Sequence, residues 1–231
     1  MTLGIMQPYL LPYIGYWQLL AAVDRFVVYD NIKYTKQGWI NRNRFLRGGA
    51  DAFFTLPLKH ASDSLNIDDR MLADDFDPRG ILNPLREAYR KAPFFDAAFP
   101  VIESIVTAAP RSLFEYLLDG IVQIASYLDI RTPITVSSTV PIDHALKADH
   151  KVLAICRALG AARYVNAIGG RELYSASAFA EQGVELAFLQ PRPIVYTQFG
   201  DPFVPSLSIV DVMMFNSRDA VKAMLGEYDL V

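Results

Sequence analysis

Two short apolar runs, and the helical pattern between them, constrain the fold of this chain more than any other feature. Residues 2–6 and 25–29 are apolar stretches of strand length, and between them apolar residues recur every three to four positions from 14 to 23. Two buried strands joined by a helix predict a right-handed parallel crossover. We therefore expect an α/β fold with a Rossmann-like parallel sheet, in which ligands bind beyond the carboxyl ends of the strands.

The middle of the chain has a different character. Residues 52–58 have the composition of a further strand, although Pro57 should place its end at an edge or in a turn. The polar, acidic stretch 62–78 is typical of a loop or of a lid over a site. Three helical patterns follow, at 81–91, 94–107 and 112–128. We expect residues 79–128 to form a helical subdomain inserted in the α/β core or appended to it.

After residue 128 the alternation of strands and helices returns. Apolar strands are expected at 134–136, 163–165 and 184–189, and helices that end at a glycine at 147–159 and 173–182. Two short helices, at 207–216 and 218–225, complete the pattern. The length of 231 residues and the hydrophobic content of 52% suffice for one large core, so we expect a single α/β domain over 1–231.

Charge and cysteine content narrow the class of protein. A formal net charge of -3 argues against broad binding of nucleic-acid backbones, although it leaves room for a local basic site. Cys156 lies in an apolar helical run and is expected to be a core residue of a protein in the reducing cytoplasm. No apolar run reaches the length of about 18 residues that a spanning helix needs, so no membrane insertion is expected.

The turn after the first strand is the first candidate site. Its glycine and tyrosines stand where a strand leads into a helix, so backbone N–H groups and the helix dipole are placed to bind an anion such as phosphate. Alternatively, Gly15 allows close packing and the tyrosines fill the space beside the sheet. The candidate substrate-binding residues here are Gln7, Tyr9, Tyr13, Gly15, Tyr16 and Gln18.

A basic, asparagine-rich stretch is the second candidate. Arginine offers a planar fork for phosphate or carboxylate, and asparagine recognises hydroxyl and amide groups. The stretch holds Lys36, Trp39, Asn41, Arg42, Asn43 and Arg44, which a loop or an irregular hairpin would bring together, and a solvated surface loop is the alternative. Asp30, at the end of the second strand, is a candidate base or metal-linked acceptor, or else a turn cap.

Two further groups follow later strands. Asn166, Gly169 and Gly170 form a glycine-bearing turn after the strand 163–165, which is either a ligand site at the sheet edge or an ordinary tight connection. Gln198, Ser208 and Asp211 carry polar groups in an apolar tail, where Ser208 alternatively caps a helix. The three histidines are scattered and the chain has a single cysteine, so no zinc site is expected and no residue is assigned as a metal ligand.

Six segments carry a resemblance to a known family: residues 6–16, 23–30, 38–43, 89–95, 164–174 and 207–211. They resemble the WbqC-like proteins, a bacterial family associated with O-antigen and other surface polysaccharide biosynthesis. The similarity extends over nearly the whole chain. It implies a pathway setting rather than a reaction. The placement of residues 12–16 is also similar, more distantly, to the histidine-glycine-histidine signature of nucleotidylyltransferases and class I aminoacyl-tRNA synthetases. Tyrosines replace both histidines here, so Lys36, Arg42 or Arg44 would have to supply the charge.

These features favour a cytoplasmic transferase that uses a nucleotide or a nucleotide-linked substrate to modify a sugar or a small amine. Asp30, Lys36 and Arg42 are the expected catalytic residues, and ATP or another nucleotide with Mg²⁺ is the expected cofactor class. The transferred group is acyl, aminoacyl or nucleotidyl. Two alternatives stay open: a non-catalytic scaffold of a glycan-assembly pathway, and a transferase that recognises RNA or aminoacyl-tRNA through residues 36–47. The acceptor and the oligomeric state are not determined by the sequence.

Overall fold

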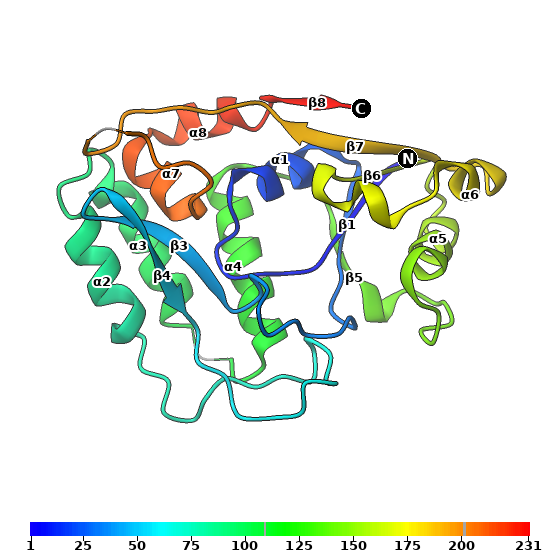
Figure 1. Cartoon of the computed structure of the whole chain (residues 1–231), viewed down its shortest axis with the longest axis horizontal. Coiled ribbons are helices and arrows are strands. Elements are labelled where there is room, and N and C mark those ends of the chain that lie inside the picture. Colours follow the sequence, from blue (N-terminus) through cyan, green and yellow to red (C-terminus); the bar gives the residue numbers. More distant parts are fainter. Residues whose placement is uncertain (109, 201) are drawn as a thin grey trace.

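The central sheet has six strands in a Rossmann-like arrangement, which confirms the expected fold class (Figure 1). A computed structural model gives the fold, and it describes residues 1–108, 110–200 and 202–231. Neighbouring strands are parallel, except that β7 and β8 are antiparallel. The order across the sheet is β5 (Ile134–Val136), β2 (Arg25–Val28), β1 (Thr2–Met6), β6 (Arg163–Ala167), β7 (Glu185–Pro191) and β8 (Tyr228–Leu230).

The order of strands fixes where a ligand site is expected. The chain adds β2 and then β5 on one side of β1, and it later returns to add β6 and β7 on the other side. The connection from β5 to β6 therefore crosses to the other side of β1, and the direction of strand addition reverses there. In a parallel sheet such a reversal opens a crevice at the carboxyl ends of the strands.

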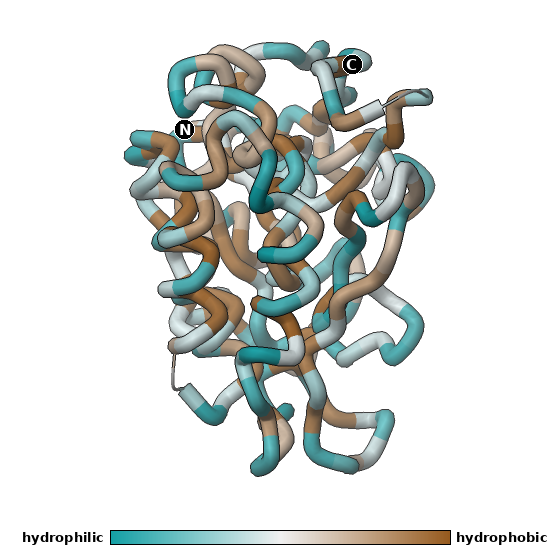
Figure 2. The backbone as a smooth tube through the Cα atoms, turned by 90° about the vertical axis from the view of Figure 1, so that its left-hand side faces the viewer, coloured by the Kyte–Doolittle hydropathy of each residue, from teal (hydrophilic) through white to brown (hydrophobic). Residues whose placement is uncertain are grey.

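The two faces of the sheet have separate apolar layers. One layer packs α1 (Ile14–Ala22) together with α7 (Ile209–Phe215), and Trp17 lies fully buried in it. The other packs α5 (Ala148–Ala158) and α6 (Ala176–Glu181) against the residues of β1 that point the other way. Figure 2 shows hydrophobic and hydrophilic residues alternating along the helices, as elements that bury one side require.

Cys156 is one of the buried residues of α5. Its side chain is fully buried, and burial raises the pKa of its thiol to about 12. A thiol with so high a pKa is not nucleophilic at neutral pH, so the expectation of a core cysteine is confirmed.

Three helices extend the layer that contains α1. They are α2 (Arg79–Tyr89), α3 (Phe95–Val106) and α4 (Leu113–Tyr127), and they lie between β4 and β5 in the chain. Ser112 caps α4 by accepting a hydrogen bond from the backbone N–H of Glu115. The α3 helix packs on both α4 and α7, so these helices share one apolar core with α1 (Figure 1). Among the described residues, no helix combines the length and the apolar content that crossing a membrane would require.

The strand expected at 52–58 lies two to three residues earlier in the chain. The observed β4 (Ala50–Thr55) pairs with β3 (Arg42–Arg47) in an antiparallel hairpin separate from the main sheet. Gly48 and Gly49 both have positive φ, 60° and 82°, which suits a two-residue hairpin turn. Pro57 cannot donate to a ladder, and residues 57–78 follow as an irregular loop with isolated bridges.

One helix begins later than expected, and one strand was not expected at all. The helix expected at 173–182 begins at Ala176, because a 3-10 turn, Ile168–Leu173, precedes it. β8 was not expected, since three residues at a sheet edge carry little periodic signal. The last helix, α8, spans Arg218–Met224.

Candidate functional site

A cavity of about 630 Å³ lies at the carboxyl edge of the sheet, and we call it the edge cavity. Tyr29 and Asn31 line it from the turn after β2, Lys151 from the first turn of α5, and Tyr174 from the segment after β6. Because β1 lies between β2 and β6, these elements flank the point where strand addition reverses. Ligands of α/β sheets bind at such points.

Lys151 places a buried ammonium group in the edge cavity. The residue is 4% exposed, and its Nζ donates a hydrogen bond of 3.1 Å to the carbonyl oxygen of Asn31. The ammonium also lies 5.1 Å from the centroid of the Tyr29 ring, within the range of a cation–π interaction. Burial lowers the pKa of Lys151, while the charges of Asp30 and Asp68 act to raise it. A buried cation with one hydrogen bond costs stability, which favours a functional role.

Asp30 supports the site from behind the turn after β2. Its carboxylate is buried, and Oδ1 accepts hydrogen bonds from Ser137 Oγ at 2.6 Å and from the backbone N–H of Ser138 at 3.0 Å. In this geometry Asp30 caps the 3-10 turn Ser137–Thr139. Burial, followed by the charge of Asp30, raises the pKa of Asp68, whose Oδ1 is buried without a protein partner. The ammonium of Lys151 thus balances two neighbouring carboxylates.

The rim of the edge cavity is basic. Lys33 and Lys147 both line it and are exposed, and Asp149 contributes a carboxylate. His144 also lines it, with its Nδ1 2.9 Å from the side-chain nitrogen of Asn31. Ala148, the first residue of α5, has a φ of 50°, a left-handed conformation that costs about 1–2 kcal/mol without glycine. Such strain is frequent at ligand sites.

The glycine turn after β6 reaches this site through Tyr174. Asn166 is buried, and its Oδ1 accepts a hydrogen bond from the backbone N–H of Ala167 at 2.8 Å. A Cβ at Gly170 would lie 2.6 Å from Asn166 Nδ2, so glycine permits this close approach, whereas Gly169 has open space around it. The same Cβ at Gly170 would lie 3.6 Å from the ring of Tyr174. The turn after β2 and the segment after β6 therefore both line the edge cavity, through Asn31 and Tyr174.

The turn between β1 and α1 lines a different cavity. We call it the aromatic pocket; it measures about 290 Å³ and is lined by Tyr9, Tyr13, Trp39, Asn43, Arg44 and Ser206. A Cβ at Gly15 would lie 2.1 Å from Tyr13 Oη, so the Tyr13 ring covers the first turn of α1. The rings of Tyr9 and Tyr16 meet edge to face at 5.4 Å. Burial raises the pKa of both Tyr13 and Tyr16, so these phenols carry no charge at neutral pH.

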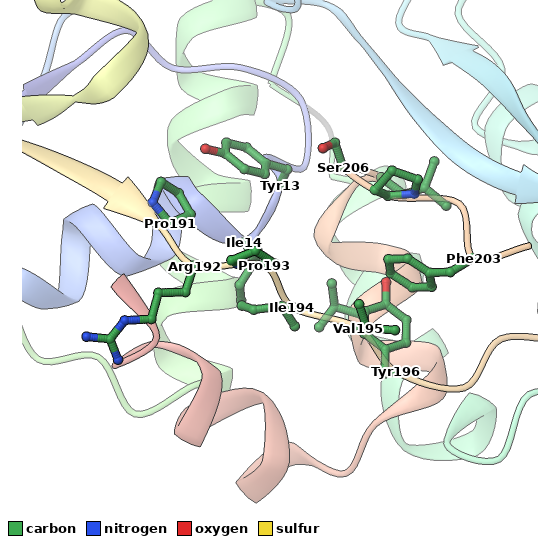
Figure 3. A pocket seen from close by; sticks show the side chains of 13 residues that line it. Tyr13, Ile14, Pro191, Arg192, Pro193, Ile194, Val195, Tyr196, Phe203 and Ser206 are labelled. Carbon is green, nitrogen blue, oxygen red and sulfur yellow. The ribbon is translucent and has the colours of Figure 1, made fainter. Parts of the chain in front are cut away.

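Figure 3 shows a neighbouring cavity, of about 400 Å³, that shares Tyr13 and Ser206 with the aromatic pocket. Its walls are mainly apolar and come from α1 and from the segment after β7. Arg192 lies at its rim, but the guanidinium points away and pairs with Asp229 at 2.5 Å. The cavity therefore lacks the cationic lining that makes the edge cavity suitable for phosphate.

Asn43 and Ser208 hold the β1–α1 turn in place. The Asn43 side-chain amide donates to the carbonyl oxygens of Leu10 at 2.9 Å and Leu11 at 2.8 Å, and its Oδ1 accepts from the backbone N–H of Arg44. Ser208 Oγ donates to the same Leu11 carbonyl at 2.6 Å. Leu11 itself has a φ of 43°. Every polar atom of the Asn43 side chain is thus bonded to backbone, and of these backbone groups the Leu11 carbonyl is also bonded to Ser208.

Asp211 joins three segments through its buried carboxylate. Oδ1 accepts a hydrogen bond from the Tyr89 hydroxyl at 2.8 Å, and Oδ2 accepts from the Tyr196 hydroxyl at 2.6 Å and from Gln198 Nε2 at 2.8 Å. Burial raises the pKa of Asp211, although all three donors act to lower it. The hydroxyl of Tyr89 in turn accepts from the backbone N–H of Leu46. These contacts link α7 to α2 and to the hairpin.

Gln18 and Asn41 also bond to backbone. Gln18 is fully buried, and its Nε2 donates to two carbonyl oxygens between α8 and β8. Asn41 donates to the carbonyl of Leu56 and accepts from the Tyr34 hydroxyl, both at 2.8 Å. Both side chains thus hold distant segments together.

Among the described residues that line the edge cavity, none is a predicted site residue. Gln7, Lys36 and Arg42 likewise lie outside it. Gln7 is half-buried directly after β1. Lys36 is exposed in the turn before the hairpin. Arg42 donates to the carbonyl oxygens of Gly38 and Gln37 at 3.0 and 2.6 Å.

Sequence reasoning did not identify Lys151, Tyr174 or Lys147 as site residues. Lys151 precedes the apolar run of α5 in phase with its buried side, which was the available signal. A lysine in a first helical turn is ordinarily solvated, so that signal was weak. Within the described parts of the chain, no group of three or more His, Cys, Asp or Glu side chains gathers as a metal site would require.

Comparisons with known proteins place the chain in a family. The model of the WbqC-like protein family matches residues 7–223. A protein of Mycobacterium tuberculosis (strain ATCC 25618 / H37Rv), described as "Uncharacterized protein Rv1507c", is 25% identical over 216 residues, which is 92% of each chain. No solved structure matches. Since the family model covers nearly the whole sequence and both sides of the edge cavity, the chain belongs to the WbqC-like protein family.

Proposed function

We propose that this protein is a transferase that binds the phosphate groups of a nucleotide or a nucleotide-linked substrate in the edge cavity. The buried ammonium of Lys151 carries the proposal. An ammonium has three N–H donors, and Lys151 gives one of them to Asn31. A phosphate oxygen would accept the others, and the low local dielectric would make that attraction strong.

Neighbouring residues support the same ligand class. Lys33 and Lys147 stand at the rim, where they can meet further phosphate oxygens. The rings of Tyr29 and Tyr174 provide walls for a base or a sugar. Asp149 also lines the cavity, and its carboxylate would hold a Mg²⁺ ion that offsets phosphate charge, since Mg²⁺ on nucleotides needs one or two protein carboxylates.

The chemistry of this arrangement is positioning and charge stabilisation. In acyl or aminoacyl transfer from an acyl-nucleotide, the acceptor attacks the carbonyl carbon and the nucleotide leaves with the electron pair of the broken bond. In nucleotidyl transfer the acceptor attacks the α-phosphorus of a nucleoside triphosphate and pyrophosphate leaves. In each case the acceptor O–H or N–H releases its proton to the departing phosphate group or to solvent. Lys151 would stabilise the negative charge that develops on that leaving group. The acceptor in this proposal is a sugar or a small amine of surface polysaccharide biosynthesis. Asp30 acts as a positioning residue, because it fixes the turn beside Asn31.

Thermal-shift measurements with nucleotides and nucleotide sugars test the proposal. A ligand at about 100 times its Kd stabilises by about 2.7 kcal/mol, which raises Tm by about 5–10 °C in a domain of this size. Lys151→Met should abolish the shift, and Lys91→Met, at an exposed end of α2, should preserve it. The proposal fails if no nucleotide stabilises the wild type, or if Lys151→Met responds equally.

Turnover assays separate a transferase from a scaffold. A donor that binds in the edge cavity should yield product with a sugar or amine acceptor, and Asp30→Asn should reduce kcat more than it weakens donor binding. Binding of donors without product from any acceptor would instead favour a non-catalytic scaffold.

A further inference from the structure

The outer face of the β3–β4 hairpin carries exposed aromatic rings. The antiparallel register places Arg44 opposite Phe53 and Arg42 opposite Thr55, so these side chains share one face, while Asn43 and Phe54 share the other. Phe53 is 55% exposed, and Trp39, from the turn before β3, is 43% exposed. Large aromatic groups rarely stay exposed together without a binding role.

The guanidinium groups of two arginines lie against this pair of aromatic rings, so that four side chains form one cluster. The rings of Trp39 and Phe53 are nearly parallel, with centroids 6.0 Å apart and an interplanar angle of 17°. The guanidinium of Arg42 lies 5.3 Å from the Phe53 centroid, and that of Arg44 lies 5.3 Å from the Trp39 centroid. We call these four side chains the hairpin stack. Flat aromatic and guanidinium surfaces are the groups on which nucleic-acid bases stack.

The guanidinium groups of the stack are held in place before any ligand binds. Arg42 donates to two carbonyl oxygens of the preceding turn. Arg44 donates to Asp51 Oδ2 at 3.1 Å and to the carbonyl oxygen of Ser206 at 3.3 Å. Such preorganisation reduces the entropy lost on binding.

The charge around the stack differs in sign from that of the whole chain. Residues 34–55 hold four cationic residues and one acidic residue, Asp51, a net charge of +3 in a chain of net charge -3. Lys36 is exposed, whereas Arg47 lies on the opposite face of β3 and pairs with Glu87 at 3.6 Å. A basic patch on an acidic protein directs a polyanion to one face.

The aromatic pocket lies beside the stack, because Trp39 and Arg44 belong to both. Its volume of about 290 Å³ and its tyrosine walls suit one planar ring. A strand that crosses the stack could therefore turn one base into the pocket.

We infer that the hairpin stack and the aromatic pocket bind a single-stranded nucleic acid. Bases stack on the rings and guanidinium planes, and Lys36 meets the phosphates. RNA and DNA offer the same stacking and phosphate chemistry, so both are candidates. An acidic polysaccharide is less suited, because its puckered rings do not match flat surfaces at both ends of a stack. None of these residues lines the edge cavity, so the inference does not depend on the proposed function.

Fluorescence anisotropy with labelled oligouridylate and oligothymidylate at low salt tests this inference. The double variant Trp39→Ala/Phe53→Ala should bind roughly tenfold or more weakly, since stacking on aromatic groups dominates such sites. Lys36→Ala should lower the slope of log Kd against log salt by about 0.7. Arg47→Ala should leave that slope unchanged, because Arg47 lies on the other face of β3 and pairs with Glu87. The exposed controls Val122→Ala, on α4, and Arg157→Glu, on α5, should bind as the wild type does.

The outcomes are distinct from those for the edge cavity. The double variant should keep its Tm and its nucleotide-induced shift, because both side chains are exposed and remote from Lys151. Preference for one oligonucleotide identifies which nucleic acid the site takes. The inference is overturned if the wild type binds neither oligonucleotide, if the double variant binds as well as the wild type, or if polygalacturonate binds and the oligonucleotides do not.

Discussion

Asn43→Ala tests whether the asparagine-rich segment clamps the fold or contacts a ligand. The side chain is 3% exposed and makes three hydrogen bonds, all to backbone. Truncation leaves the carbonyl of Leu10 and the N–H of Arg44 without this partner, whereas the carbonyl of Leu11 keeps Ser208. If the Asn43 amide donated to a ligand, one of these hydrogen bonds would have to break, because both of its N–H donors are already used.

The expected loss of stability follows from these contacts. A buried backbone group left unpaired costs about 1–3 kcal/mol, so two such groups and one weakened contact give a loss of about 3 kcal/mol. The variant also removes a restraint on Leu11, whose φ of 43° costs stability by itself. In a domain of this size each kcal/mol lowers Tm by about 2–4 °C, so Tm should fall by about 6–12 °C.

Calorimetry and urea denaturation provide the measurement. Asn83→Ala is the matched control, because Asn83 is exposed on α2 and the same substitution there should change stability by about 0.5 kcal/mol or less. If Asn43→Ala unfolds within about 1 °C of the wild type, the clamp argument is refuted. If it keeps its Tm and loses ligand binding, Asn43 is a binding residue instead.

Three further perturbations have defined outcomes. Burial lowers the pKa of Lys151 below its ordinary value of 10.5. The charged ammonium therefore lowers the free energy of unfolding at neutral pH. This cost disappears as the pH rises through the lowered pKa toward 10.5, where the side chain is neutral in both the folded and the unfolded protein. Urea denaturation should therefore show Lys151→Met gaining stability relative to the wild type at pH 7, with the gain shrinking toward about pH 10. Gly15→Ala should lower stability by about 1–3 kcal/mol, since the new Cβ meets a tyrosine hydroxyl, while Gly169→Ala, in open space, should be neutral by calorimetry. Tyr89→Phe should cost about 1–3 kcal/mol in the same assay, because the buried carboxylate of Asp211 loses a donor, and a neutral result would contradict that.

Local patterns of apolar residues in the sequence predicted the main sheet well. β1 and β5 were predicted with the bounds that they have, and the helices of the middle section differ from prediction by a few residues at their ends. Apolar periodicity reports which side of an element is buried, and burial is what stabilises each element. The hairpin was harder, because Asn43 and Arg44 alternate between faces without a simple apolar pattern.

The residues of the candidate site were harder still. Asn43, Ser208 and Gln18 have the chemistry expected of ligand contacts, and the same chemistry pairs buried carbonyl groups. An amide looks identical in sequence whether its partner is substrate or backbone.

The sequence by itself determined the α/β alternation, the family resemblance and the sheet edge at which a site should form. The tertiary structure alone decided which side chains meet there. It brings Lys151, 120 positions along the chain, against Asn31, and it sends the tyrosines of the β1–α1 turn to a separate pocket beside the hairpin. The physical reason is that periodicity is a local property of the chain, whereas a binding site depends on contacts between segments that only the packed sheet brings together.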